Sequence, residues 1–239
     1  MPDSAGIDAT PDVAPDSGAE PSTGDSSGDN TGGCSGIDGG NCQSRQPGTL
    51  VIIGTTYSET GTAITYGIAP DLWDVSALAG PGENPPQLTA TAGALSMSAI
   101  LTSSSSGPGW VGAIVSLHGA GCLDETNYAE GVQFTLSGDL GGCLLYLDAI
   151  TSPDQAAALD ACRGGCLASA GDCALPSYEV SQMGSIAVPN ASFSGGVPEY
   201  APDVRSLIGF RWRLEAPEAN GGSGCAANIT IANVELIGI

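Results

Sequence analysis

The sequence has very little positive charge. It contains five arginines and no lysine against 26 Asp and Glu residues, which gives a formal net charge of −21. Such a chain repels phosphate backbones and anionic lipid headgroups, so we expect neither nucleic-acid binding nor electrostatic docking to a membrane. No apolar run approaches the ~20 residues that a transmembrane helix needs, so we expect no transmembrane segment.

Residues suited to catalysis are also scarce. His118 is the only histidine, and residues 50–239 contain no nucleophile motif such as G-x-S-x-G. A Ser-His-Asp or Cys-His mechanism would therefore have to use His118. Paired carboxylates for glycoside hydrolysis are a distant alternative, because the chain has many acids but the sequence marks no pair. We expect a protein that is not an enzyme.

The first 49 residues lack the apolar side chains that a core requires. They are mostly Asp, Gly, Ser, Pro, Thr and Ala, with Arg45 as their one base. Such a segment cannot offset the entropy of being ordered, so we predict a disordered acidic tether over residues 1–49. No signal peptide follows Met1. We expect that an export signal has been removed. An acidic tether after a removed signal resembles a bacterial lipoprotein, and this resemblance implies a protein that is extracellular or held at a bacterial cell surface. The alternative is a cytosolic protein with reduced thiols.

Residues 50–239 alternate between apolar and polar side chains in short runs separated by Gly, Pro and Asp. In the run Leu207–Glu215, for example, Phe210 and Trp212 face one way while Arg211 and Arg213 face the other. A side-chain period of two is typical of strands with one buried face. We therefore predict one all-β sandwich domain over residues 50–239, with four large aromatics in its core. The expected core aromatics are Trp110, Phe134, Phe210 and Trp212.

One segment reads as a helix inserted between strands. Ser152 is a good N-cap, Pro153 suits the first helical position, and Gln155 stands at the capping-box position. We predict a short helix from Ser152 to about Cys162, ending before Gly164-Gly165.

The chain has eight cysteines, an even number in an acidic, loop-rich sequence. This favours disulfides and an oxidising compartment. We predict that Cys122 pairs with Cys143 and Cys34 with Cys42, and that Cys225 reaches one of the cysteines in the insertion. A zinc site at the three insertion cysteines, Cys162, Cys166 and Cys173, is the alternative, and it requires reduced thiols and a fourth ligand. The eight are Cys34, Cys42, Cys122, Cys143, Cys162, Cys166, Cys173 and Cys225.

Several segments, in order, resemble one family. They are Trp110–Ala113, Asp124 with Tyr128 and Gly131–Phe134, Val188-Pro189, Phe193–Gly196, Ile208–Trp212 and Ile229–Leu236. Together they are similar to the galactose-binding-like β-jelly-roll of family 11-type carbohydrate-binding modules and related secreted bacterial lipoproteins. The resemblance implies a jelly-roll fold whose concave sheet face holds a glycan. It also suggests a structural calcium ion, but Ala232-Asn233 stands where the family often has an Asp pair.

Other acidic segments are weak calcium candidates. Asp71–Asp74 and Asp124-Glu125 are rich in oxygen but lack the spacing of a known calcium loop, so solvated surface acids are the favoured interpretation. We expect no cofactor.

Arg211 and Arg213 are the strongest local signal for binding. They lie two apart on the polar face of one strand, and a guanidinium donates paired hydrogen bonds to vicinal sugar hydroxyls or to a carboxylate. The alternative is that both pair with nearby acids such as Glu215 or Asp148. Further candidates for the same polar face are Gln133, Thr135, Tyr146, Asp148 and His118.

Two functions follow from these patterns. The first is non-catalytic binding of a polysaccharide or oligosaccharide, which the paired arginines favour. The second is a structural or protein-interaction surface domain that binds no glycan. The chain's 12 aromatic residues favour the second, because few are left to serve as exposed platforms for sugar rings.

Overall fold

The structure is a computed structural model. It describes residues 43–44, 49–50, 64–68, 71–91, 93–104, 107–117, 123–124, 130–157, 163–167, 172–217 and 224–237. Most of the tether predicted over residues 1–49 lies outside these ranges, and the domain boundary at residue 50 stays a prediction. No described helix is long and apolar enough to cross a membrane.

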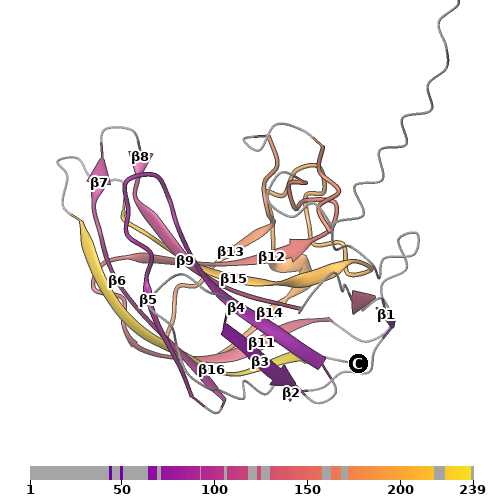
Figure 1. Cartoon of the computed structure of the whole chain (residues 1–239), viewed down its shortest axis with the longest axis horizontal. Coiled ribbons are helices and arrows are strands. Elements are labelled where there is room, and N and C mark those ends of the chain that lie inside the picture. Colours follow the sequence, from indigo (N-terminus) through magenta and orange to yellow (C-terminus); the bar gives the residue numbers. More distant parts are fainter. Residues whose placement is uncertain are drawn as a thin grey trace, which may run out of the picture. The chain divides into compact units, whose positions relative to one another are not determined.

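The described strands form a sandwich of two sheets, shown as two layers in Figure 1. The first sheet runs in the order β3, β4, β9, β15, β12 and β13, and the short strands β1 and β10 join it at β15. Its strands are β1 (Gln43–Ser44), β3 (Ile64–Ile68), β4 (Asp71–Ala79), β9 (Trp110–Leu117), β10 (Leu123–Asp124), β12 (Leu144–Thr151), β13 (Ser177–Glu179) and β15 (Leu207–Glu215).

The second sheet runs in the order β14, β11, β16, β6 and β5, with β2 pairing on β16. All of its neighbouring strands are antiparallel. This confirms the predicted all-β sandwich. Its strands are β2 (Thr49–Leu50), β5 (Gln87–Thr91), β6 (Ala94–Leu101), β11 (Gly131–Asp139), β14 (Gly184–Pro189) and β16 (Cys225–Ile237). A small pair, β7 (Ser103–Ser104) with β8 (Gly107–Pro108), and the 3₁₀ turn η1 (Asn190–Ser192) complete the described elements.

The core lies between the two sheets and follows from the period-two pattern. On β15 the side chains of Phe210, Trp212 and Leu214 are buried, while Arg211 and Arg213 point to the opposite face. Trp212 meets Phe134 of β11 edge to face, with ring centroids 5.7 Å apart. Contacts of this kind between facing strands are the main source of stability in a sandwich.

A disulfide between Cys143 and Cys225 joins the two sheets. Cys143 directly precedes β12 of the first sheet, and Cys225 opens β16 of the second. The predicted Cys122–Cys143 pair is therefore wrong, as is a bond from Cys225 to the insertion. That prediction used nearness along the chain, whereas the packing of the two sheets brings these strand ends together.

Within the insertion, Cys166 pairs with Cys173. This bond removes two of the three thiols from the alternative zinc site. The remaining cysteines, Cys34, Cys42, Cys122 and Cys162, lie outside the described residues.

The helix predicted from Ser152 is not present over residues 152–157. These residues form turns, and Ala156 makes an isolated bridge with Cys166. The hydroxyl of Ser152 donates to the carbonyl of Arg163 instead of capping a helix, at 2.6 Å. Contacts across the insertion thus override the local capping signal. Residues 158–162 lie outside the described ranges.

Candidate functional site

The outer face of the first sheet gathers four of the predicted site residues. On the neighbouring strands β12 and β15, Asp148 lies opposite Arg211 and Tyr146 lies opposite Arg213. Directly opposed residues of an antiparallel pair point to the same side of the sheet. We call the cluster of Trp110, Tyr146, Asp148, Arg211, Arg213 and Glu215 the arginine site.

Asp148 is the anchor of the arginine site and is fully buried, with an exposure of 0%. Its carboxylate accepts hydrogen bonds from Nε of Arg211 at 2.6 Å and from Nε of Arg213 at 3.0 Å. The hydroxyl of Ser177 on β13 donates a further bond at 2.5 Å. Burial by itself raises the pKa of Asp148, but the two guanidinium groups outweigh it and hold this pKa below its usual value.

The two arginines differ in how many of their guanidinium nitrogens donate hydrogen bonds within the site. Arg213 also donates through Nη2 to Asp148 at 3.3 Å and through Nη1 to Glu215, and it lies over the ring of Tyr146. Arg211 binds Asp148 through Nε alone, so its terminal nitrogens have no hydrogen-bond partner among the described residues. Arg213 is thus a structural member of the site, and Arg211 has donors left for a ligand.

The position of Arg211 depends on two residues of β9. Its guanidinium lies over the ring of Trp110, with Cζ 5.5 Å from the ring centroid. A Cβ atom placed on Gly112 would lie 3.3 Å from Cγ of Arg211, so the bare glycine leaves room for the arginine stem. Trp110 and Gly112 thus complete a seat for Arg211 on the outer face of the sheet.

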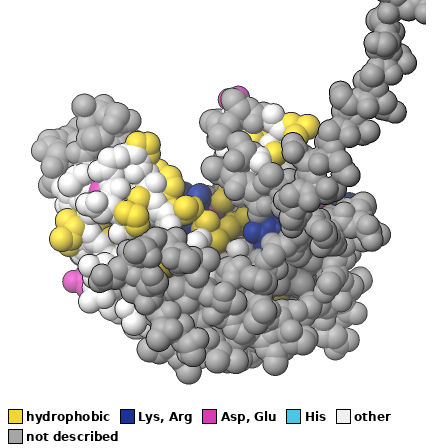
Figure 2. Space-filling model, in the orientation of Figure 1, with side chains coloured by type: hydrophobic (Ala, Val, Ile, Leu, Met, Phe, Trp, Pro, Cys, Tyr) yellow, Lys and Arg dark blue, Asp and Glu magenta, His cyan; other side chains and the backbone are white. Residues whose placement is uncertain are grey.

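Arg211 lines a cavity of about 270 Å³ on this face. In Figure 2, hydrophobic and basic side chains lie together in a hollow over the strands of the first sheet. None of the described residues that line the cavity is acidic, although the chain carries a net charge of −21. The lining combines aliphatic side chains with hydrogen-bonding groups: Leu78, Ile114, Ile150, Leu175 and Ile208, with Ser76, Ser116, Gln155, Arg163 and Arg211.

Two predicted members of the site lie elsewhere. Gln133 and Thr135 belong to β11 of the second sheet, where Nε2 of Gln133 donates to Glu235 at 2.6 Å. The alternation of a strand shows which of its residues share a face, but not which sheet the strand joins. His118 lies outside the described residues.

Trp110 and Gly112 were missed as site residues. The prediction placed Trp110 in the core, but Val111, Ala113 and Val115 are the β9 residues that belong to the core cluster, so Trp110 falls on the outer face. The period-two alternation, counted from Val111 as a core residue, would have predicted that Trp110 lies on the outer face.

The acidic segments considered for calcium, Asp71–Asp74 and Asp124-Glu125, lie outside the residues whose side chains are described. Among the described residues, no group of three or more His, Cys, Asp or Glu side chains is placed to hold a metal ion.

Comparisons with known proteins do not assign the chain to a family. No family model matches the sequence, and no curated protein is significantly similar to it. One similar solved structure is the solution structure of CtCBM11, studied for its dynamics and binding. The identity is 13% and the TM-score 0.37, over 80% of this chain and 96% of that chain. This TM-score is too low to transfer a ligand or a binding site.

Proposed function

We propose that the outer face of the first sheet is a non-catalytic glycan-binding site centred on Arg211. The observation that carries the proposal is the hydrogen bonding of the Arg211 side chain. Its Nε is fixed by the buried carboxylate of Asp148, while its terminal nitrogens lack a described partner and the residue lines the cavity. The arginine is thus held in place before a ligand arrives.

The chemistry of this arrangement suits a sugar. The two terminal nitrogens of a guanidinium can donate parallel hydrogen bonds to vicinal hydroxyls or to the carboxylate of an acidic sugar. Because Asp148 and Trp110 already restrict the side chain, little rotamer freedom is lost on binding. The aliphatic lining of the cavity offers contact to the C–H faces of a sugar ring.

The same geometry argues against catalysis at this site. A glycosidase needs two carboxyl groups that reach the substrate. Asp148 is fully buried and held by Arg211, Arg213 and Ser177, and its lowered pKa keeps it from acting as an acid. Glu215, the other carboxylate of the arginine site, is paired with Arg213.

A second candidate function is a structural or protein-interaction domain without glycan binding. The engagement of Arg213 favours it, because Asp148, Glu215 and Tyr146 together occupy the guanidinium. In this case the cluster serves to hold β12 against β15.

Affinity electrophoresis of the full chain separates the two candidates. The gels contain either alginate, an acidic polyuronate, or the neutral glucan hydroxyethylcellulose. We expect retardation by at least one of them. The Kd of Arg211→Ala should rise about tenfold or more for that glycan, with a smaller rise for Arg211→Lys, which keeps the charge but loses the paired donors.

Arg205→Ala is the matched control, because Arg205 is exposed at 73% and pairs with Asp203 away from the arginine site. It should bind like the unaltered protein, and circular dichroism should show that all variants are folded. Absence of retardation by both glycans would favour the structural function. Retardation that is unchanged in both Arg211 variants would contradict the arginine site as the place where the glycan binds.

A further inference from the structure

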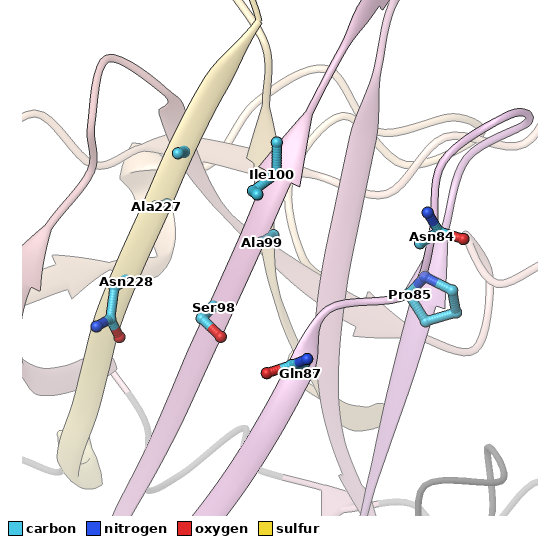
Figure 3. Close-up of a pocket in the computed structure, with 9 residues that line it drawn as sticks. Asn84, Pro85, Gln87, Ser98, Ala99, Ile100, Ala227 and Asn228 are labelled. Atoms are coloured by element: carbon cyan, nitrogen blue, oxygen red, sulfur yellow. The ribbon is translucent and has the colours of Figure 1, made fainter.

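The outer face of the second sheet carries a separate groove of about 460 Å³. It lies over β5, β6 and β16 and over the loop that precedes β5, as Figure 3 shows. None of its lining residues belongs to the arginine site. We call it the amide groove, and it is lined by Asn84, Pro85, Gln87, Ser98, Ala99, Ile100, Ala226, Ala227 and Asn228.

A row of polar side chains crosses this groove. Gln87 of β5 lies opposite Ser98 of β6, and Ser98 lies opposite Asn228 of β16. Neighbouring strands are about 5 Å apart, so the row offers regularly spaced hydrogen-bonding groups across three strands. None of these side chains bonds to another residue that the structure describes. In the next row, by contrast, the hydroxyls of Ser96 and Thr230 bond to each other at 2.9 Å.

The described lining of the amide groove contains no charged side chain. Two described carboxylates adjoin the groove, Glu83 next to Asn84 in the chain and Asp139 opposite Asn228 in the register of β11 and β16, and both accept hydrogen bonds from other groups. Glu83 accepts hydrogen bonds from the backbone and hydroxyl of Thr102, and Asp139 accepts one from the backbone of Gly141. Amides and hydroxyls both donate and accept hydrogen bonds, so the groove matches a neutral ligand whose groups also do both.

Apolar surface lies beside the polar row. Ile100 of β6 is exposed at 78%, and Pro85 is exposed as well. Amide and hydroxyl groups beside bare C–H surface fit a molecule with hydroxyl edges and C–H faces. A sugar ring has both.

We propose that the amide groove is a second glycan site, which holds a neutral oligosaccharide or polysaccharide chain laid across β5, β6 and β16. A peptide that extends a sheet pairs along a free strand edge and runs parallel to the strands. The polar row runs across the strands, so a ligand that follows it cannot form such a ladder. This second site does not depend on the arginine site.

The test is affinity electrophoresis of the full chain through gels of three neutral glycans, hydroxyethylcellulose, galactomannan and dextran. The variant is Gln87→Ala/Asn228→Ala, and both side chains are exposed, so folding should be unaffected. We expect at least one neutral glycan to retard the protein, and its Kd to rise at least tenfold in the variant. Gln182→Ala/Ser185→Ala is the matched control, because it removes an exposed amide and an exposed hydroxyl outside the groove.

A second readout separates this site from the arginine site. In ¹⁵N–¹H spectra with the same neutral glycans, the side-chain amide signals of Gln87 and Asn228 should shift, and they should still shift in Arg211→Ala. No retardation by any of the three glycans, or binding lost in Arg211→Ala but kept in the amide variant, would overturn the second site. The latter result would leave the arginine site standing, whereas loss of binding only in the amide variant would leave the amide groove standing.

Discussion

The two candidate sites, one on each outer face of the sandwich, differ in chemistry. On the first sheet, two arginines, two carboxylates and two aromatic rings form one cluster beside an aliphatic cavity. On the second sheet, amide and hydroxyl groups line the amide groove, and its described lining contains no charged side chain. The chain has five arginines and 26 acids, and the carboxylate of Asp148 holds two of these arginines, Arg211 and Arg213, by hydrogen bonds.

The bond that joins the sheets should have the largest effect on stability. The Cys143–Cys225 disulfide spans a sequence separation of 82, so Cys143→Ala/Cys225→Ala should lower the unfolding free energy by about 4 kcal/mol. The Cys166–Cys173 bond spans a separation of 7, and Cys166→Ala/Cys173→Ala should lower it by about 2 kcal/mol. Urea unfolding at pH 7 measures both. Equal losses would mean that the bond between the sheets is no more important than the one inside the insertion.

The stability of the first sheet should depend on Asp148 far more than that of the second sheet depends on Asp139. Asp148→Asn leaves two partly buried arginines without their counter-charge, and we expect a loss of about 3 kcal/mol in unfolding free energy. Asp139→Asn, an exposed change at the end of β11, should alter it by less than about 0.5 kcal/mol. Urea unfolding tests the pair, and a loss below about 1 kcal/mol for Asp148→Asn would show that the cluster is not an anchor.

Removal of the aromatic ring beneath Arg211 should have a smaller effect, which we expect in glycan binding. Trp110→Leu keeps apolar bulk but removes the π face beneath the guanidinium, a contact worth roughly 0.5–1 kcal/mol at exposed sites. We expect about threefold weaker binding of the glycan that the arginine site holds. Ile100→Ala, on the other sheet, should leave this affinity unchanged. A Trp110→Leu variant that binds at full strength would remove Trp110 from the site.

Two buried carboxylates should titrate in opposite directions. The pKa of Asp148 is lowered by its arginines, whereas burial raises the pKa of Asp154. Among the described residues, the carboxylate of Asp154 accepts hydrogen bonds from the hydroxyl of Thr151 and the backbone of Glu199. The stability from Asp148 is therefore present above its unfolded pKa of ~3.9 and is lost as pH falls through the lower folded value. The contribution of Asp154 has the opposite sign. It is present below ~3.9 and is lost as pH rises through its higher folded pKa.

Carboxyl ¹³C titration by NMR measures both midpoints directly. Midpoints in the reverse order would contradict the geometry of the two sites. Unfolding measurements between pH 2 and about pH 6 should show a larger acid-side loss in the unaltered protein than in Asp148→Asn, in which the lowered pKa of Asp203 remains.

Local alternation predicted the sandwich and the outward direction of Arg211 and Arg213, because each needs only one strand's own pattern. Pairing between strands was the part that failed. Gln133 alternates correctly but belongs to the other sheet, and Cys143 bonds to a strand end 82 residues away. These outcomes depend on which strands become neighbours, and no short stretch of sequence contains that information.

The amide groove depends even more on strand pairing that the sequence pattern does not predict. Gln87, Ser98 and Asn228 come from three strands, and each alone reads as an ordinary polar residue on a sheet face. Only the register of the second sheet places them in one row. The arginine site was partly predictable because two of its members are two residues apart on one strand.

The central claim is that Arg211 is the group that meets the ligand, and ¹⁵N–¹H NMR of the arginine Nε and tryptophan Nε1 signals tests it most directly. The full chain has five arginines and three tryptophans, so these signals are few. On addition of alginate and β-glucan oligosaccharides, we predict shifts for Arg211 and Trp110, with Arg205 and the buried Trp212 unchanged. Unshifted Arg211 and Trp110 signals with both oligosaccharides, or shifts confined to other residues, would contradict the claim.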